Sequence, residues 1–414
     1  MNLKDLRINA KRLQSTLEES AKIGGTANGG ITRLTLTDED KKMRDLFVKW
    51  LKEINLEVTI DEMGNIFGRR SGKNDQLTPV LSGSHLDTQP KGGRFDGIFG
   101  VLGALEVMRT LHENHIGTER PLIIVDWTNE EGSRFAPAMM SSGVWCGGLK
   151  RDWIYGRTDV NGKTFLSELE RIGYRGKVPA QSFPLHAYYE LHIEQGPILE
   201  REKKIIGAPK GILCLHWYDI YLEGEANQVG PTPMEGRHDA LCAAAEMILK
   251  VNALPSKMGG NMVATVGEIQ NGPNSRNIVP DKVHFTVDIR SWDDEYAIRA
   301  WEDLKQDFVD IAKRRGCPIR IEETWRVKHA EFDSKLHERV IDVSKNLGYS
   351  ALKMVSGAGH DAGYLNQIAP AAMIFVPSIN GRSHVEVEKT TYEDCAAGAN
   401  VLLHCLLETA NELG

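Results

Sequence analysis

The sequence has no long apolar run, no excess of basic residues and no closely spaced pair of cysteines. Its 414 residues include 50 Lys or Arg and 57 Asp or Glu, a formal net charge of −7, which argues against nucleic acid or an anionic membrane as the main partner. No apolar stretch reaches the roughly 18 residues that span a bilayer. Residues 1–13 are charged and amphipathic, without the apolar core of a signal peptide. We therefore expect a protein that binds neither nucleic acid nor membrane.

The cysteines are few and scattered, and no two of them form a CxxC pair. In a chain of this length that pattern predicts reduced, mostly buried thiols and a cytoplasmic location. The six positions are Cys146, Cys214, Cys242, Cys317, Cys395 and Cys405. Hydrophobic residues make up 41% and charged residues 26%, which is typical of a globular protein. The chain is too long for one simple core, so we expect two domains.

A glycine-rich segment, residues 83–100, follows an apolar run that predicts a buried strand over residues 78–82. The loop contains His85, Asp87 and Asp96, and a buried helix is predicted over residues 97–109. A strand, a loop with polar residues and a helix together place ligands at the carboxyl edge of a sheet, where α/β enzymes keep their sites. On its own, the segment is equally compatible with a glycine-rich turn whose polar side chains are satisfied.

Two further apolar strands, predicted over residues 120–132 and 188–197, also end in polar residues. The candidate ligands at strand ends are His85, Asp87, Asp96, Glu130, Glu131, His192, Glu194 and, near the C-terminus, His384. Mixed histidine and carboxylate ligands suit a divalent metal that activates water for hydrolysis. Adjacent carboxylates allow one to bind metal and the other to move protons. A solvated carboxylate or a core histidine explains any one of these residues, but not the whole set at strand ends.

The remaining periodicity predicts the other elements and the division into domains. Helices are expected at 1–22, 37–55, 160–173, 239–254, 293–315, 334–347 and 391–413. Strands are expected at 57–61, 65–69, 214–223, 262–269, 282–290, 318–326 and 373–376. The middle of the chain thus has a βα-ββ-αβ pattern, which predicts a small α+β domain inserted into a larger one. We place the first domain at 1–212 and 328–414, and the insertion at 213–327.

Five motifs, in this order, resemble those of the dinuclear-metal amidohydrolases of the peptidase M20 group. They are Gly83-Ser-His-Leu-Asp-Thr, Gly92-Gly-Arg-Phe-Asp-Gly, Thr128-Asn-Glu-Glu-Gly-Ser-Arg-Phe, Glu190-Leu-His-Ile-Glu-Gln-Gly-Pro and Gly381-Arg-Ser-His-Val-Glu. Within the group, the chain is most similar to the hydantoinase/carbamoylase branch, and the likeness covers essentially its whole length. The resemblance implies an α/β, metal-dependent exopeptidase-like catalytic domain with an inserted α+β lid and dimerisation domain.

The resemblance also implies two divalent metal ions per subunit, Zn²⁺, Mn²⁺ or Co²⁺. One ion is expected at His85, Asp96 and His192. The other is expected at Glu131 and His384, with Asp96 as the bridge. The resemblance makes Glu130 the general base that takes a proton from the attacking water and passes it to the leaving nitrogen, and it makes Asp87 the residue that orients His85.

Further positions are implied to bind a small-molecule substrate that bears a carboxylate. Asn277 and Arg290, in the insertion, match the carboxylate clamp, for which the planar guanidinium of arginine is well suited. Gln195 and the loop with Gly359 and His360 are expected to line the pocket. Without the resemblance, the alternative interpretation of Arg290 is a surface charge on a strand. The family's insertion also implies a homodimer.

One motif departs from the family. Its lid usually reads Asn-His-Ala-Gly-Thr-Thr-Pro-Met, and this sequence reads Asn227-Gln-Val-Gly-Pro-Thr-Pro-Met234, so Gln228 stands in the place of the histidine that stabilises the oxyanion. An amide donates a hydrogen bond but carries no positive charge, and loss of one such donor costs about 10²–10³ in rate. A different substrate, a weakened enzyme and an engineered or degenerate variant all remain open. His216 and His238 are nearby in sequence and could compensate.

These observations support one main hypothesis and two alternatives. The main hypothesis is an amidohydrolase that cleaves the C–N bond of a small N-carbamoyl or N-acyl amino acid or a ureido acid. The first alternative is an M20-type dipeptidase or aminoacylase. The second is a homologue of low activity that binds ligand without efficient turnover, because Gln228 replaces the lid histidine.

Overall fold

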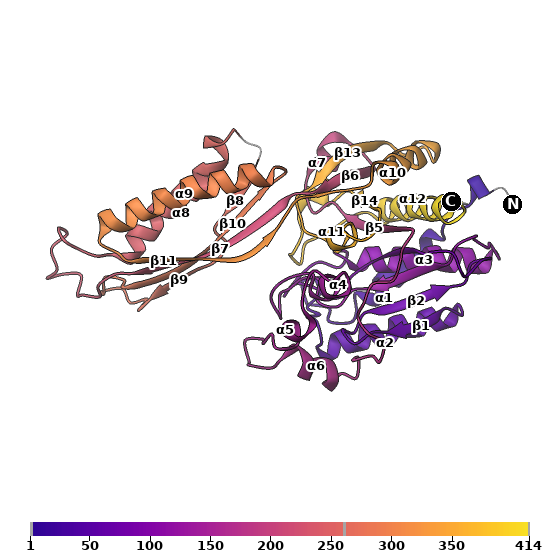
Figure 1. The fold of residues 1–414 in the computed structure, drawn as a ribbon, viewed down its shortest axis with the longest axis horizontal. Helices are drawn as coiled ribbons and strands as arrows, with labels where there is room; N and C mark the ends of the chain where they lie inside the picture. Colours follow the sequence, from indigo (N-terminus) through magenta and orange to yellow (C-terminus); the bar gives the residue numbers. More distant parts are fainter. Residues whose placement is uncertain (1–2, 260–261, 413–414) are drawn as a thin grey trace. The chain divides into compact units, whose positions relative to one another are not determined.

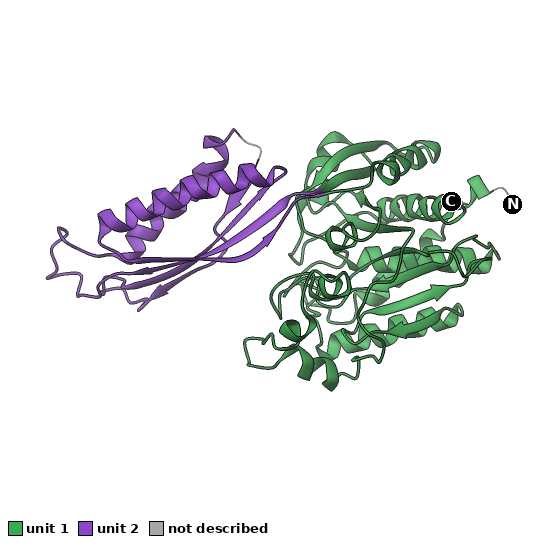
Figure 2. Cartoon of the chain, in the orientation of Figure 1, with its two compact units in different colours: residues 1–211, 331–414 green, residues 212–330 purple. Residues whose placement is uncertain are grey.

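The computed structural model describes residues 3–259 and 262–412 (Figure 1). The chain forms two compact units, residues 1–211 with 331–414 and residues 212–330 (Figure 2). The insertion predicted at 213–327 lies just inside the second unit. Because residues 1–2 and 413–414 lie outside the description, the outermost ends of the predicted helices 1–22 and 391–413 do too.

The first unit contains a nine-stranded sheet in the order β1-β2-β4-β3-β5-β14-β6-β12, with β13 paired to β6. Its strands are β1 (Glu57–Ile60), β2 (Ile66–Arg70), β3 (Val80–Ser84), β4 (Leu122–Asp126), β5 (Ala187–Ile193), β6 (Ile206–Ile212), β12 (Ala330–Glu331), β13 (Ala351–Ser356) and β14 (Ala371–Val376). The four central strands β4, β3, β5 and β14 are mutually parallel. They are buried along their full length, as expected for a parallel sheet covered on both faces.

Helices accompany this sheet. They are η1 (Leu3–Asp5), α1 (Ala10–Ser20), α2 (Asp38–Glu53), α3 (Ile98–Glu113), α4 (Met140–Trp145), α5 (Arg151–Tyr155), α6 (Phe165–Arg171), α7 (Ile198–Glu202), α10 (Ser334–Asn346), α11 (Ala362–Leu365), η2 (Ile379–Gly381) and α12 (Tyr392–Ala410). The helix predicted over 1–22 is interrupted because Asn9 caps α1, its side chain accepting from the amide of Arg12. The helix predicted from residue 160 begins at Phe165, where Thr164 is the N-cap.

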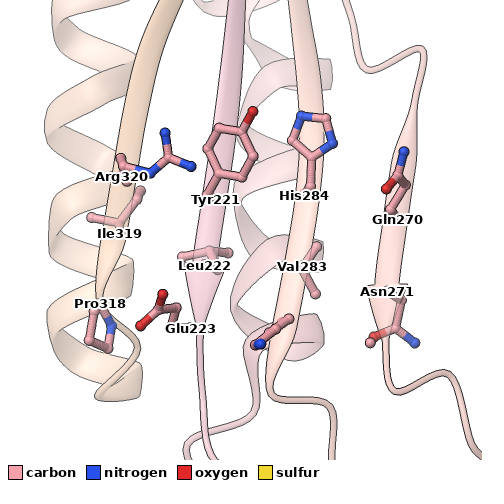
Figure 3. Close-up of a pocket in the computed structure, with 12 residues that line it drawn as sticks. Tyr221, Leu222, Glu223, Gln270, Asn271, Val283, His284, Pro318, Ile319 and Arg320 are labelled. Atoms are coloured by element: carbon pink, nitrogen blue, oxygen red, sulfur yellow. The ribbon is translucent and has the colours of Figure 1, made fainter. Parts of the chain in front are cut away.

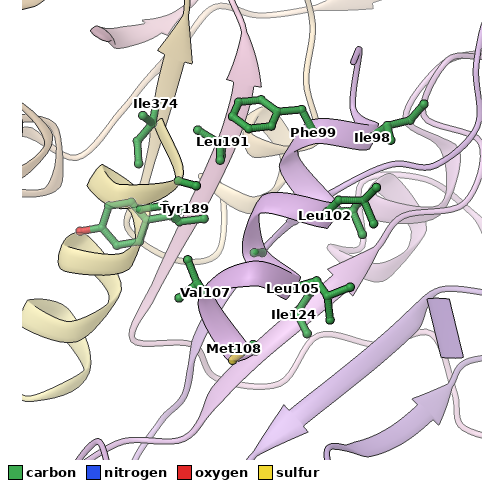
Figure 4. Close-up of a cluster of buried hydrophobic side chains, with 14 of the residues drawn as sticks. Ile98, Phe99, Leu102, Leu105, Val107, Met108, Ile124, Tyr189, Leu191 and Ile374 are labelled. Atoms are coloured by element: carbon green, nitrogen blue, oxygen red, sulfur yellow. The ribbon is translucent and has the colours of Figure 1, made fainter. Parts of the chain in front are cut away.

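The core of the first unit is centred on α3. Ile98, Phe99, Leu102, Leu105 and Met108 of this helix lie among apolar side chains of the sheet (Figure 4). These include Ile124 of β4, Tyr189 and Leu191 of β5, and Ile374 of β14. The packing holds the start of α3, and therefore the loop that precedes it, against the carboxyl end of the parallel strands.

The second unit has a five-stranded antiparallel sheet in the order β11-β7-β10-β8, with β9 paired to β10. The elements are β7 (Cys214–Glu223), α8 (Ala240–Lys257), β8 (Met262–Thr265), β9 (Ile269–Gly272), β10 (Lys282–Ser291), α9 (Asp294–Arg315) and β11 (Ile319–Val327). Both helices cover one face of the sheet (Figure 1). The strand predicted over 262–269 is two short strands, β8 and β9. The predicted α/β fold class is confirmed.

None of the helices within residues 3–259 and 262–412 is long and apolar enough to cross a membrane. All six cysteines are free thiols. Four of them are buried, Cys146 is half-buried and Cys242 is exposed, in agreement with the prediction of reduced, mostly buried thiols.

Candidate metal centre and active site

The predicted ligands meet because they follow neighbouring parallel strands. His85 comes directly after β3, and Glu130 and Glu131 follow β4. His192 lies in β5, one residue before its end, and His384 lies in the loop after β14. The order β4-β3-β5-β14 puts the carboxyl ends of these strands side by side.

Asp96 belongs to two groups of side chains that could hold a metal ion. One is His85, Asp96 and His192, and the other is Asp96, Glu131 and His384, each with its donor atoms within 4.8 Å of one another. The Oδ1 atom of Asp96 is 3.2 Å from Nε2 of His192, and its Oδ2 atom is 3.1 Å from Nε2 of His384. The carboxylate therefore turns one oxygen to each group, which is the arrangement a bridging ligand needs.

The two buried imidazoles are held with Nε2 toward Asp96. Nδ1 of His85 donates to the carbonyl oxygen of Asp87 at 2.9 Å, and Nδ1 of His192 donates to that of Ile193 at 2.9 Å. These bonds place the proton on Nδ1 and leave the lone pair of Nε2 available to a cation.

Gly97 fills the narrow space between these two rings. Its amide donates to Nε2 of His192 at 3.1 Å, and its φ is +66°, a conformation that glycine adopts without strain. A Cβ at this position would lie 2.2 Å from Nε2 of His85. The glycine after Asp96 is therefore required by close approach to the imidazole as well as by the turn.

Asp87 contacts His85 and also the segment that contains Glu130 and Glu131. The contact to Nδ1 of His85 is made by its backbone carbonyl, while its carboxylate Oδ1 is 3.7 Å away. The two carboxylate oxygens instead accept the amides of Glu130 and Glu131, each at 3.3 Å. Asp87 thus ties the segment with both glutamates to the loop with His85.

The donor set fits divalent cations. Burial, with the nearby carboxylate of Asp96, raises the pKa of Glu131 to about 7. Burial, with Asp361, Glu131 and other carboxylates, raises the pKa of Glu130 well above its usual range. A divalent cation at each group would relieve this repulsion, and imidazole with carboxylate suits Zn²⁺, Mn²⁺ or Co²⁺.

Glu130 is not a member of either donor group, but its side chain lies beside the first of them. Its side chain is buried, and Oε2 is 3.4 Å from Nε2 of His85. A carboxylate at this position can reach a water held between the donor groups without being one of the ligands. Glu194 also stands outside these groups: its carboxylate accepts the amides of Ile198 and Leu199 at 2.7 and 2.8 Å and so caps α7. The interpretation of Glu194 as a candidate ligand is therefore wrong.

Three residues of the centre adopt positive φ although none is glycine. They are Asn129 (φ 60°), Gln195 (φ 59°) and His384 (φ 59°). Such residues cluster at functional sites because the surrounding structure must hold them there. Gln195 Nε2 donates to Oδ2 of Asp96 at 2.8 Å and lies 3.3 Å from Nε2 of His384. The structure therefore places Gln195 against the second donor group; its predicted contact with substrate stays a prediction.

His360 and Gly359 lie in the loop after β13. The His360 ring is buried against His192, with ring centroids 4.5 Å apart, and its Nε2 is 3.1 Å from Oγ of Ser356. Glu190, His192 and His360 form a further potential donor group. His360 thus packs against the ring of His192. Its contact with substrate stays a prediction.

The sequence interpretation missed Glu388. Its Oε1 accepts the amides of Phe95 and Asp96 at 3.0 and 3.1 Å. Its Oε2 accepts from Oγ of Ser383 at 2.7 Å, and that Oγ is 3.0 Å from Oδ2 of Asp96. Glu388 therefore connects the loop of Asp96 with the loop of His384. A Cβ at Gly93 would lie 1.9 Å from Oε1 of Glu388, so the structure requires glycine there, but residues so far apart in sequence leave no local pattern that marks the contact.

We expect Glu388→Ala to lower metal affinity by about 10–100-fold, the usual effect of losing a residue that holds metal ligands in place. The substitution leaves the amides of Phe95 and Asp96 without their acceptor. Glu388→Gln keeps an acceptor oxygen and should lose less. Titration calorimetry with Mn²⁺ or Zn²⁺ measures the effect. Glu386→Ala, two residues away and bonded to Asn28 at the surface, is the control; equal affinity in Glu388→Ala and Glu386→Ala would refute the role.

The remaining predicted residues lie in the second unit. The amide of Val229 donates to the carbonyl of Asn277 at 3.1 Å, and Gln228 pairs with Ile278, so Gln228 and Asn277 are brought side by side on exposed loops. The guanidinium of Arg290 is held by the Asp288 carboxylate at 2.8–3.1 Å.

Asn277 and Arg290 do not form a clamp within one chain. Asn277 precedes β10, and Arg290 is one residue before the end of that strand. Arg290 lies eight positions after Lys282 in β10, a span of about 26 Å at ~3.3 Å per residue. The motif identified both residues but could not show that they lie at opposite ends of a strand.

Neither nearby histidine stands in for the lid histidine in the way the sequence suggested. His216 is wholly buried inside the second unit, with Nε2 2.9 Å from Oδ1 of Asp294. The ring of His238 is half-exposed, 3.9 Å from Glu225.

A cavity of about 620 Å³ lies on the second unit's sheet, where Tyr221, His284 and Arg320 project from neighbouring strands (Figure 3). Arg320 lies 3.8 Å over the Tyr221 ring, and the His284 ring stacks on the same tyrosine at 4.6 Å. None of the predicted site residues lines it.

Comparison with known proteins gives consistent results. The sequence profile described as Peptidase family M20/M25/M40 matches residues 81–408. An N-carbamoyl-L-amino-acid amidohydrolase of Rhizobium meliloti is 44% identical over 404 residues, which cover 98% of this chain and 97% of that protein. An allantoate amidohydrolase of Bacillus subtilis is 32% identical over 397 residues, covering 95% and 96%. The crystal structure of an amidase of the hydantoinase/carbamoylase family from Burkholderia vietnamiensis matches with a TM-score of 0.94 and 47% identity, over 99% of each chain.

Proposed function

Because the chain belongs to peptidase family M20/M25/M40, we propose that it hydrolyses the C–N bond of a small N-carbamoyl amino acid or ureido acid with the help of two divalent ions. It is a hydrolase of C–N bonds other than peptide bonds, as its named relatives are. The observation that carries the proposal is the position of Asp96, whose two oxygens face two separate donor groups beside Glu130.

The first ion would be held by His85, Asp96 and His192, and the second by Asp96, Glu131 and His384. Zn²⁺, Mn²⁺ or Co²⁺ bound there would polarise the substrate carbonyl and make a water acidic enough to attack it near neutral pH. The protein contributes rigid donors, because the backbone carbonyls of Asp87 and Ile193 fix the two buried imidazoles.

Glu130 moves the proton. It takes one from the attacking water as the new C–O bond forms, and it gives that proton to the nitrogen as the C–N bond breaks. Its buried position raises its pKa well above the usual range, which suits a group that must both accept and release a proton near neutral pH.

The second unit would bind the carboxylate of the substrate. Gln228 and Asn277 lie together, while Arg290 lies at the other end of β10. If both sets contact one substrate, they must come from two different chains, which supports a homodimer. The free, scattered thiols support a cytoplasmic location.

A screen of the metal-reconstituted protein tests the proposal. We expect ammonia or amine release from N-carbamoyl and ureido acids, loss of that activity on chelation, and its return with Zn²⁺, Mn²⁺ or Co²⁺. Unchanged turnover after complete metal removal would contradict the metal mechanism. Cleavage of dipeptides alone would favour the M20-type dipeptidase or aminoacylase.

The low-activity alternative rests on Gln228, an exposed amide on the lid loop. Testing Gln228→His in the same screen separates the possibilities. A gain of about 10²–10³ on N-carbamoyl amino acids means that the native protein is a weakened carbamoylase. No gain there, with native activity on another ureido or acyl acid, means that the pocket is specialised for that substrate.

A further inference from the structure

The second unit contains a group of metal-binding side chains that shares no residue with the candidate active site. Cys214 and His216 are two residues apart on β7, so their side chains project from the same face of the strand. Asp294 is the first residue of α9. The thiol, imidazole and carboxylate donor atoms all lie within 4.8 Å of one another.

These three side chains are in the interior of the unit. Cys214 and His216 are each 0% exposed, and the Asp294 side chain is 13% exposed. His216 Nε2 is 2.9 Å from Oδ1 of Asp294. A buried histidine–aspartate pair that joins a strand to the start of a helix accounts for two members of the group. It does not require a thiol beside them.

The second polar atoms of His216 and Asp294 each have a partner of their own, as those of metal ligands usually do. The hydroxyl of Tyr218 is 3.4 Å from Nδ1 of His216, so its oxygen can accept a hydrogen bond from Nδ1–H when Nε2 binds a cation. Arg326 is 3.4 Å from Oδ2 of Asp294 and holds the oxygen that does not face His216. Metal-binding histidines and carboxylates usually have such partners on their second polar atom.

We propose that Cys214, His216 and Asp294 bind one Zn²⁺ ion inside the second unit, with water at the fourth position. A thiolate with an imidazole favours Zn²⁺ over harder ions such as Mg²⁺, whereas the active-site groups contain only imidazole and carboxylate. Cys214 would bind as the thiolate, and the proton of its thiol is released to water. His216 would bind through Nε2, with the proton of the bound imidazole on Nδ1.

Cobalt substitution of the full-length protein tests this site independently of the proposed function. A thiolate-to-cobalt charge-transfer absorption is expected in the Co²⁺-loaded wild type, because this group supplies a sulfur ligand and the active-site groups do not. Cys214→Ser should abolish the band and remove one equivalent of tightly bound zinc. Cys242→Ser, which changes an exposed thiol of the same unit, should keep both.

A second variant covers the case in which Cys214→Ser disturbs the core. Tyr218→Phe keeps the ring that stacks on Trp301 at 3.5 Å and removes only the hydroxyl beside His216. It should weaken binding at this site by about 10–100-fold and leave the active-site metal content unchanged. Absence of the band in the wild type, or its persistence in Cys214→Ser, would overturn the proposal.

Discussion

Glu130→Gln is expected to lower kcat by about 10²–10⁴, the usual contribution of a positioned general acid–base group, while metal binding stays close to that of the wild type. The substitution preserves the size of the side chain and removes its ability to accept a proton. Glu130 belongs to neither donor group, so the contacts of Asp96 with His192 and His384 should remain. Steady-state kinetics on the substrate found in the screen, with metal content measured on the same samples, checks the result.

Turnover and metal content, measured together, identify the role of Glu130. Loss of turnover together with loss of metal would mean that Glu130 acts as a ligand or supports one, for example through the 3.4 Å contact with His85. Retained turnover would remove Glu130 as the base. KM should change little, because the residue moves a proton and does not grip the carboxylate of the substrate.

Local sequence patterns predicted those elements that are long and strongly periodic. The strand expected over 214–223 is β7 with the same bounds, and the helix expected over 293–315 is α9 with Asp293 as its N-cap. Both have a clear alternation or a clear cap in the sequence. β6 and β13 were not predicted, since their places in the sheet come from pairing with each other and not from a local pattern.

The candidate site was predictable where its residues follow strands, because parallel strands bring their carboxyl ends together whatever the loops do. Contacts between distant loops were not predictable. Glu388 accepts hydrogen bonds from the amides of Phe95 and Asp96, and it lies 292 positions after Asp96 in the sequence. No local pattern near Glu388 marks these partners. The motif resemblance likewise identified Asn277 and Arg290, but it did not show that the length of β10 separates them.

Asp96→Asn is expected to have the largest effect on the metal centre, because it changes the residue shared by both donor groups. Burial alone would raise the pKa of Asp96, but the neighbouring imidazoles of His192 and His384 hold it well below the usual range. Asparagine offers one oxygen instead of two and no charge. We expect affinity for both ions to fall by at least about 100-fold, with turnover lost.

His384→Ala is the matched comparison. It removes a ligand from the second group only and leaves His85, Asp96 and His192 in place. Metal analysis after dialysis, made in a Cys214→Ser background so that the proposed zinc of the second unit is not counted, should then find two ions with no further change, one with His384→Ala and none with Asp96→Asn. If Asp96→Asn retained the same single ion as His384→Ala, Asp96 would serve one group and not two. In that case the proposed bridge would be wrong, and the protein would work with ions that are held independently.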